Sequence, residues 1–195
     1  MTTSSTGGSM ARFDGGAPAG PIPRRATSPT GASVVHAEVD RTLDLRPDPV
    51  VGPLAGARWR NYMLTGLVLP GADLRRLFVE ASTLDGADLS CCQLDQAHLI
   101  DSRFTGAVFQ RARMQQAVLV NVNLQDADLR HVDLSAAVLV YCDLRGARLA
   151  GAQLQDTVWS HSDLRGVDLS ETSLDRARGD FFWDADTRWP VAFTP

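Results

Sequence analysis

The sequence predicts an all-β repeat protein whose chain winds as a square coil, and two observations support this prediction. Every fifth residue from Leu54 to Leu174 is large and apolar. The residue two positions before it is usually small. A period of five fits neither a helix with 3.6 residues per turn nor the two-residue alternation of a flat strand, so a repeat architecture remains. Short extended pieces joined by tight corners then place four pentapeptides in each coil.

The two inward positions of each pentapeptide differ in size. The small position is mostly Ala, Ser, Thr or Cys, and only Tyr62, Leu67 and Leu77 are bulky there. Val79 follows Leu77 and is smaller than its counterparts, which indicates compensation of volume within one coil. The large position is uncharged and apolar throughout and is occupied by Leu54, Trp59, Leu64, Leu69, Leu74, Val79, Leu84, Leu89, Leu94, Leu99, Phe104, Phe109, Met114, Leu119, Leu124, Leu129, Leu134, Leu139, Leu144, Leu149, Leu154, Trp159, Leu164, Leu169 and Leu174.

A coil of four pentapeptides predicts that residues twenty apart lie above one another. The segments 117–120 and 137–140 both read Ala-Val-Leu-Val, which supports that spacing. Glycine, and Asp or Asn less readily, tolerates the positive φ that a tight corner can require. One column carries such residues at this spacing: Gly66, Gly86, Gly106, Asp126, Gly146 and Gly166.

The five-residue pattern resembles that of the pentapeptide-repeat family, whose consensus is A(D/N)LXX. The resemblance covers roughly two-thirds of the chain and implies a right-handed quadrilateral β-helix, a pentapeptide-repeat solenoid of about six coils with capped ends. At the strand spacing of about 4.8 Å, such a rod is roughly 30 Å long. The closest matches to the consensus are Ala72-Asp73-Leu74, Ala87-Asp88-Leu89, Ala127-Asp128-Leu129 and Ala147-Arg148-Leu149.

The chain divides into a repeat domain and two flanking regions. Residues 1–33 are rich in Gly, Ser, Thr, Pro and Ala, so we expect a disordered tail. Residues 34–52 carry apolar residues that break the rhythm, and we expect them to cover the open first coil as an N-terminal cap. Residues 53–178 form the repeat β-helix, and 179–195 an aromatic C-terminal cap. The alternative for this last segment is an aromatic docking site or dimer contact, formed by Phe181, Phe182, Trp183, Trp189 and Phe193.

The pattern argues against an enzyme, a cofactor and a metal site. A solenoid with a filled interior leaves no concave pocket for a small molecule. Acidic pairs such as Asp85 with Asp88 recur because the repeat puts Asp before the central Leu. The scattered His residues share no metal-ligand spacing with the Cys residues. Cys92 and Cys142 fall at small inward positions, where a reduced thiol fills space, and Cys91 points outward.

The charge pattern argues against direct binding of nucleic acid. Between Pro53 and Arg178 there are 15 acidic residues and 13 Arg, which leaves a net charge of 13 − 15 = −2 with the signs interleaved. A basic stripe is missing. We expect Arg148 to bridge Asp128 and Asp168 on successive coils. The chain has no apolar run long enough for a membrane helix, and Met1 to Ser9 lacks the features of a secretion signal, so we expect a cytoplasmic protein without a membrane partner.

One outward surface is apolar where the others are polar, and contiguous exposed apolar surface usually marks a contact. We expect this surface to bind a second copy of the chain, the chain's own terminal segments or another protein. His98 lies in the same column. The apolar strip is the candidate protein-binding site and consists of Phe78, Ile100, Val118, Val120, Val138, Val140, Tyr141 and Val158.

These observations favour a non-enzymatic scaffold for protein–protein interaction, with an unidentified protein partner or a homodimer. The family resemblance implies an alternative, because some members bind DNA gyrase or topoisomerase IV, mimic duplex DNA and protect the enzyme from quinolones. The near-neutral surface, the excess of central Leu over Phe and the unbroken register argue against that alternative. A third possibility is a purely structural, self-assembling role that needs no foreign partner.

Overall fold

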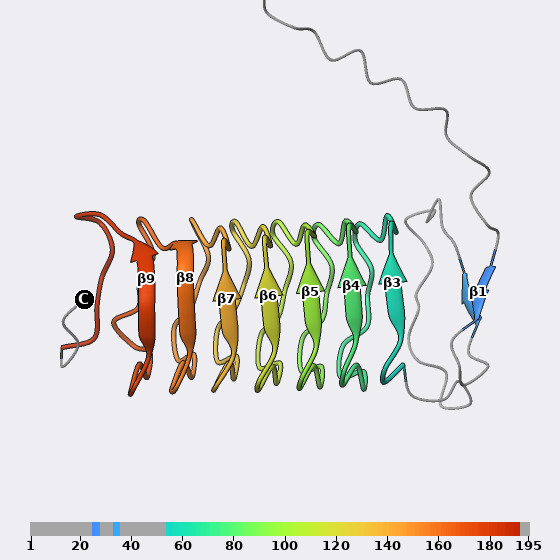
Figure 1. Cartoon of the computed structure of the whole chain (residues 1–195), viewed down its shortest axis with the longest axis horizontal. Helices are drawn as coiled ribbons and strands as arrows, with labels where there is room; N and C mark the ends of the chain where they lie inside the picture. The colour runs from blue at the N-terminus through green and yellow to red at the C-terminus, as the bar shows by residue number, and fades with distance from the viewer. Residues whose placement is uncertain (1–24, 28–32, 36–53, 192–195) are drawn as a thin grey trace, which may run out of the picture.

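The computed structural model describes residues 25–27, 33–35 and 54–191, and these residues contain β-strands and turns but no helix. Strands β1 (Arg25–Thr27) and β2 (Ser33–Val35) pair antiparallel. The expected disordered tail and N-terminal cap otherwise lie outside the described residues. The second sheet is parallel, follows the order of the sequence (Figure 1) and consists of β3 (Arg58–Arg60), β4 (Phe78–Glu80), β5 (His98–Ile100), β6 (Val118–Val120), β7 (Val138–Val140), β8 (Val158–Asp163) and β9 (Arg178–Phe182).

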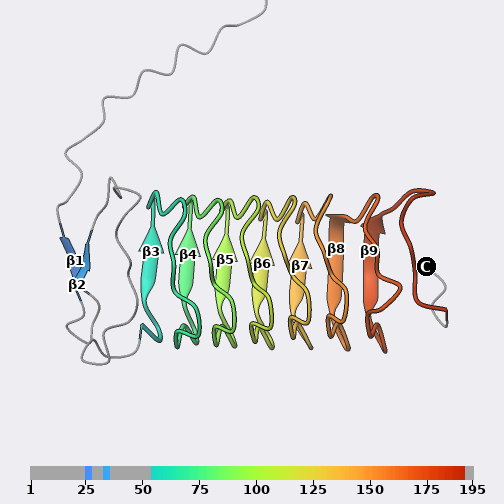
Figure 2. The ribbon, with the colours of Figure 1, turned by 180° about the vertical axis from the view of Figure 1, so that it is seen from behind.

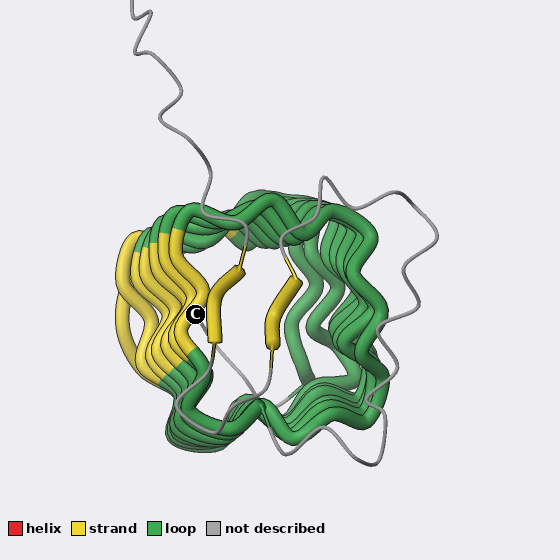
Figure 3. The backbone as a smooth tube through the Cα atoms, turned by 90° about the vertical axis from the view of Figure 1, so that its right-hand side faces the viewer, coloured by secondary structure: helices red, strands yellow, loops and turns green. Residues whose placement is uncertain are grey.

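The chain forms a four-sided coil, and the parallel sheet runs along one side of it (Figure 3). Residues twenty apart are opposed in this sheet, as Val118 is with Val138. The other three sides are joined mainly by isolated parallel bridges with the same spacing, such as Val108 with Asp128. Strands β8 and β9 continue past the corner at His161 onto the next side. Figure 2 shows the same stack of coils from behind. The structure therefore confirms an all-β parallel β-solenoid of about six turns.

The interior is one continuous apolar column. Every large inward residue from Trp59 to Leu174 is buried, and Leu54 packs partly buried against the first coil. Leu67 and Leu77 are also buried at the small position, at 3% and 1% exposure, so the first coils accommodate large side chains there. Because apolar burial is the main source of stability, this column defines the fold.

Buried hydroxyl groups at the small positions have hydrogen-bond partners within the solenoid. Ser82 donates to the carbonyl oxygen of Glu80 and accepts from the amide of Tyr62. Thr157 donates to the carbonyl oxygen of Leu154 and accepts from the indole nitrogen of Trp159 at 2.9 Å. These small polar side chains therefore occupy the interior without leaving an unsatisfied group.

The corners have left-handed backbone, as the glycine column indicated, but they do not require glycine. The column from Gly66 to Gly166 has φ between 57° and 72°, with Asp126 at the low end. Among residues 54–191, sixteen non-glycine residues also have positive φ, including Ala81, Ala136 and Tyr141. Left-handed backbone costs an L-residue about 1–2 kcal/mol. The stacked coils therefore impose this corner on residues that do not favour it.

The strand ladder continues beyond residue 178, the expected end of the repeat. β9 pairs with β8, and the register shifts by one residue between Trp159 and Ser162. Gly179 permits the close approach, because a Cβ atom added there would lie 1.8 Å from the carbonyl oxygen of Trp159. The ring of Phe181 packs edge-on against Trp159 and tilted against Trp189. The aromatic segment thus adds a further rung and packs on the end of the column.

Candidate protein interface

The structure brings the apolar strip together on the side of the coil that carries the parallel sheet. We call the outward side chains of β3–β9 the strand face. Val118, Val138 and Val158 stand in register in one column, with Phe78 at its start and His98 between. In the second column Ile100, Val120 and Val140 stand in register across the buried central residues. Each strip residue on a strand is half-buried, which leaves its apolar tip in contact with solvent.

Tyr141 extends the strip around one corner of the coil. It directly follows β7, has φ of 54° and is 59% exposed. Its ring lies 5.1 Å from the ring of His161, and His161 lies 6.4 Å from Phe182. Tyr141, His161 and Phe182, together with Trp183, line a surface hollow of about 530 Å³.

The apolar strip predicted from the sequence does not include His161, Phe182 or Trp183. Phe182 and Trp183 are 54% and 52% exposed and are, with Tyr141, the large aromatic side chains exposed among the described residues. The register shift between β8 and β9 moves Phe182 next to the corner. A strict twenty-residue frame does not predict this position. The crowding of aromatic residues after Gly179 indicated only that aromatic side chains gather at this end of the coil.

Charged groups lie at both ends of the strand face. At the first coils the guanidinium of Arg58 lies 5.3 Å from the centre of the Phe78 ring, and Arg60 pairs with Glu80 at 2.6 Å. At the last coil Arg178 is exposed, and Asp180 lies 3.1 Å from the Nδ1 atom of His161. The strand face is therefore an apolar centre with charged ends, which is the usual anatomy of a protein interface.

The other sides of the coil carry self-paired charges instead. Asp128 accepts from the backbone amide and the guanidinium of Arg130, two residues later in the same coil. The side-chain hydrogen bond from Arg130 lowers the pKa of Asp128. The same local pairing joins Asp73 to Arg75, and it recurs at Asp143–Arg145 and Asp163–Arg165.

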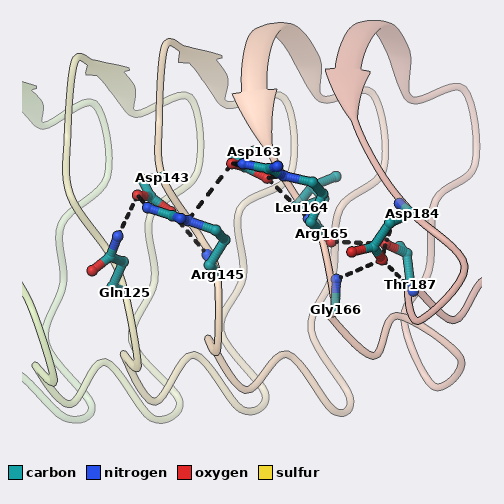
Figure 4. A network of polar contacts seen from close by, with 9 residues as sticks. All are labelled: Gln125, Asp143, Arg145, Asp163, Leu164, Arg165, Gly166, Asp184 and Thr187. Carbon is teal, nitrogen blue, oxygen red and sulfur yellow. Dashed lines mark hydrogen bonds and ion pairs between the residues drawn. The ribbon is translucent and has the colours of Figure 1, made fainter.

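These pairs also connect successive coils (Figure 4). Arg145 holds Asp143 at 2.6 Å and reaches Asp163 of the next coil, with its Nε atom 3.6 Å from the carboxylate. Gln125 donates to Asp143 from the preceding coil. Burial alone would raise the pKa of Asp143, but the hydrogen bonds from Arg145 and Gln125 outweigh it and lower that pKa. Acids held in this way are neutralised locally and are poor candidates for catalysis.

The expected bridge from Arg148 to two carboxylates is wrong. Asp128 forms its ion pair with Arg130, and Asp168 accepts from Ser170 and Arg188. The reason is local geometry, because the carboxylate that accepts the amide of residue i+2 already points toward that residue's side chain. Coil-to-coil stacking alone therefore does not determine the partners of outward charges.

The cysteines lie where the sequence predicted them. Cys92 and Cys142 are buried at small inward positions, and Cys91 is exposed at a corner. Burial raises the pKa of both inward thiols to about 11. These two thiols are therefore protonated and unreactive at neutral pH. Within the described residues no group of His, Cys, Asp or Glu is arranged to hold a metal ion. That part of the chain also has no helix long and apolar enough to span a membrane.

Comparison with known families finds pentapeptide repeats. A family profile described as Pentapeptide repeats, in eight copies, matches residues 87–126, 97–135, 117–151 and 142–178. A comparison with curated protein sequences finds no match.

Solved structures of the same architecture match the fold. The pentapeptide-repeat protein Rfr23 of the cyanobacterium Cyanothece 51142 aligns with a TM-score of 0.51 and 20% identity, over 68% of this chain and 90% of that one. QnrB1, a plasmid-mediated fluoroquinolone resistance protein, aligns with a TM-score of 0.48 and 18% identity, over 65% of this chain and 85% of that one. HetL of Nostoc sp. strain PCC 7120, involved in regulation of heterocyst differentiation, aligns with a TM-score of 0.34 and 20% identity, over 70% of this chain and 86% of that one. The match to Rfr23 supports the fold and not a shared function.

Proposed function

Because this chain belongs to the pentapeptide-repeat family, we propose that it is a non-catalytic scaffold that binds a protein partner through the apolar strip. The observation that supports this proposal is the register of the strip, which aligns apolar side chains of β4–β8 on one side of the coil. Solvent-facing apolar side chains are not needed to build the solenoid, since the other sides form with polar residues at the same positions. Their gathering on one side is therefore best explained by a contact.

Capture of binding proteins from native cell extract tests this proposal. The test variant is Val118→Asp/Val138→Asp, which puts two charges at the centre of the strip. The matched control is Val108→Asp, because Val108 is also half-buried and outward but lies in a column that already contains Asp88 and Asp128. We expect the wild-type protein and the control to retain the same partner and the double variant to lose it. Equal capture by all three proteins would contradict the proposal.

Binding of DNA gyrase is the second candidate, and the rod shape of the solenoid is the observation that favours it (Figure 1). The local Asp–Arg pairs argue against it, because a mimic of duplex DNA needs unpaired negative charge along its surface. A gyrase supercoiling assay, with and without ciprofloxacin, tests this candidate. Inhibition of supercoiling or protection from the drug at micromolar protein would favour gyrase binding, and no effect would exclude it.

A further inference from the structure

The outward apolar residues of the strand face are partly mirrored about β6. Moving outward from Val118, one column has His98 and Val138, then Phe78 and Val158, then Arg58 and Arg178 at its two ends. Moving outward from Val120, the other column has Ile100 and Val140, then Glu80 and Ser160. Arg60 of β3 stands at one end of this column, and at the other end Asp180 of β9 lies at the register shift between β8 and β9.

From this symmetry we infer that the partner of the apolar strip is a second copy of the chain, packed face to face and antiparallel about a two-fold axis along β6. The inference rests on the proposed function and names its partner. A two-fold interface uses the same patch on both copies, so the patch must be complementary to itself. The strand face meets that requirement at Val118 and Val120 on the axis and at the pairs Phe78–Val158 and Ile100–Val140, whereas His98 meets Val138 and Glu80 meets Ser160.

The antiparallel arrangement matches chemistry across the interface. Val118 and Val120 meet their own counterparts at the axis, Ile100 meets Val140, and Phe78 meets Val158. In this arrangement Arg60 of each copy lies toward Asp180 of the other, and both side chains are 64% exposed. An ion pair between the copies would replace the pairs that Arg60 makes with Glu80 and Asp180 makes with His161 within one copy. Arg58 faces Arg178, but this pair lies at the ends, where long charged side chains extend into water.

The parallel arrangement of two copies fits less well. A two-fold axis along the length of the solenoid would place each column of one copy opposite the other column of its partner. Phe78 would then face Glu80, and Arg58 would face Arg60. An apolar ring against a carboxylate and two opposed guanidinium groups cost free energy without compensation. The antiparallel arrangement avoids the apposition of ring and carboxylate, whereas opposed guanidinium groups lie at the ends of the interface in both arrangements.

The size of the face indicates a weak dimer. Six strand intervals of about 4.8 Å give a sheet roughly 29 Å long. A side of three-residue strands is about 10 Å wide, so the area falls below the roughly 800 Å² per copy of a standard interface. We therefore expect a dissociation constant in the micromolar range or above.

Light scattering after gel filtration tests the dimer with the full chain. Between about 1 and 200 µM, concentrations that bracket a weak interface, we expect the wild-type mass and the mass of Val108→Asp to rise from monomer toward dimer. We expect Val118→Asp/Val138→Asp to remain monomeric with an unchanged circular dichroism spectrum. A wild-type protein that stays monomeric at the highest concentration, or a double variant that dimerises equally, would overturn the inference.

A short bismaleimide crosslinker tests the register, in a Cys91→Ser background that removes the exposed thiol. Val118→Cys lies on the axis and should crosslink to its own counterpart. Val158→Cys alone should not crosslink, but an equimolar mixture with Phe78→Cys should. Cys92 and Cys142 are buried and should not react. Crosslinking of Val158→Cys to itself, or failure of Val118→Cys to crosslink, would overturn the antiparallel register.

The two proposals can fail separately. If the wild-type chain is monomeric and the double variant still loses a captured partner, the strip binds another protein and the dimer is excluded. If the chain is monomeric and capture is equal for all variants, both proposals are wrong.

Discussion

The strand face and the opposite side of the coil are built on the same interior but differ in their outward chemistry. The opposite face consists of the outward residues that flank every fourth central position, at twenty-residue spacing from Leu69 to Leu169. Its central residues are as buried as those beneath the strands, with Leu129 and Leu119 both 1% exposed. Its outward residues include Asp128 paired with Arg130, whereas the strand face presents Val118 and Val120 at the same height of the rod.

This difference distinguishes the residues that the fold requires from the outward residues that it does not require. Both faces keep the twenty-residue spacing and the same hydrogen bonds between coils, as shown by Val118 N to Ala97 O at 2.8 Å and Val108 N to Ala87 O at 2.8 Å. The outward residues are therefore free to vary without loss of the coil. The apolar choice on one side is the feature that requires a functional explanation.

The largest effect we predict is the same on both faces. Leu119→Ala under the strand face and Leu129→Ala under the opposite face should each lower the free energy of unfolding by about 2–5 kcal/mol, because each leaves a cavity in the column. Chemical denaturation of the two variants measures this loss. A large loss at Leu119 with almost none at Leu129 would show that the two faces do not share one cooperative interior.

The next largest effect is a difference in stability between two Gly→Ala variants, because the added methyl group meets different atoms at the two positions. In Gly179→Ala, beside the strand face, the added Cβ meets the carbonyl oxygen of Trp159, and φ is +122°. In Gly151→Ala, at a corner of the opposite face, it meets the ring of His131, which can rotate away. We expect a loss of about 2 kcal/mol or more at Gly179 and about 1 kcal/mol at Gly151.

Hydrogen exchange locates the effect of these two substitutions. Gly179→Ala should increase amide exchange in β8 and β9, because the shift of the backbone separates these strands. Gly151→Ala should leave that pair protected. Equal protection of β8 and β9 in both variants would contradict the close approach at Gly179.

The interior of the fold could be predicted from the sequence, and the outward pairing could not. A period of five fixes which residues point inward, and every large position from Trp59 onward is buried. Arg148 was assigned the wrong role because coil stacking does not report how a carboxylate is oriented by the amide two residues later. The register shift at β9 was missed because it depends on a backbone contact between Gly179 and Trp159.

The strip residues could be placed but not their neighbours. The twenty-residue frame aligned Val118, Val138 and Val158 in one column, as the structure does. Phe182 and Trp183 joined Tyr141 only through the register shift that follows β8. Left-handed corners were predicted for one glycine column, whereas many non-glycine corners share them. Such conformations depend on the stacking of coils and not on local preference.

A smaller effect is predicted at the corners that border the strand face. Ala136 precedes it and Ala81 follows it, with φ of 58° and 48°. Glycine removes the left-handed strain but adds entropy to the unfolded chain, so we expect each Ala→Gly change to stabilise the protein by about 0.5 kcal/mol. Thermal unfolding measures this gain, and a loss of stability at both corners would contradict the assigned conformation.

The smallest effect concerns pH and belongs to the opposite face. The hydrogen bond from Arg130 lowers the pKa of Asp128, so the folded state binds its proton less readily than the unfolded state. This contribution is present above the unfolded pKa of about 3.9 and is lost as the pH falls through that value toward the folded pKa. We expect at most about 1 kcal/mol, since the pair is partly exposed.

Denaturation between pH 6 and 3 checks this pH dependence in the wild-type protein and in Arg130→Gln. The variant should lose less stability on acidification, because Asp128 then has no guanidinium to favour its charged form. An equal loss in both proteins would show that the pair does not contribute. The strand face gives the contrast, since Val118→Asn should leave the acid-dependent loss unchanged.

The most direct test of an occupied strand face is hydroxyl-radical footprinting of the full chain in native extract and as dilute purified protein. Tyr141 and Phe78 lie on the apolar strip, and Met63, 72% exposed on an adjoining side, is the internal reference. We predict that extract protects Tyr141 and Phe78 from oxidation and leaves Met63 unchanged. Equal oxidation of all three residues in both conditions would contradict the assignment of this face as a binding surface.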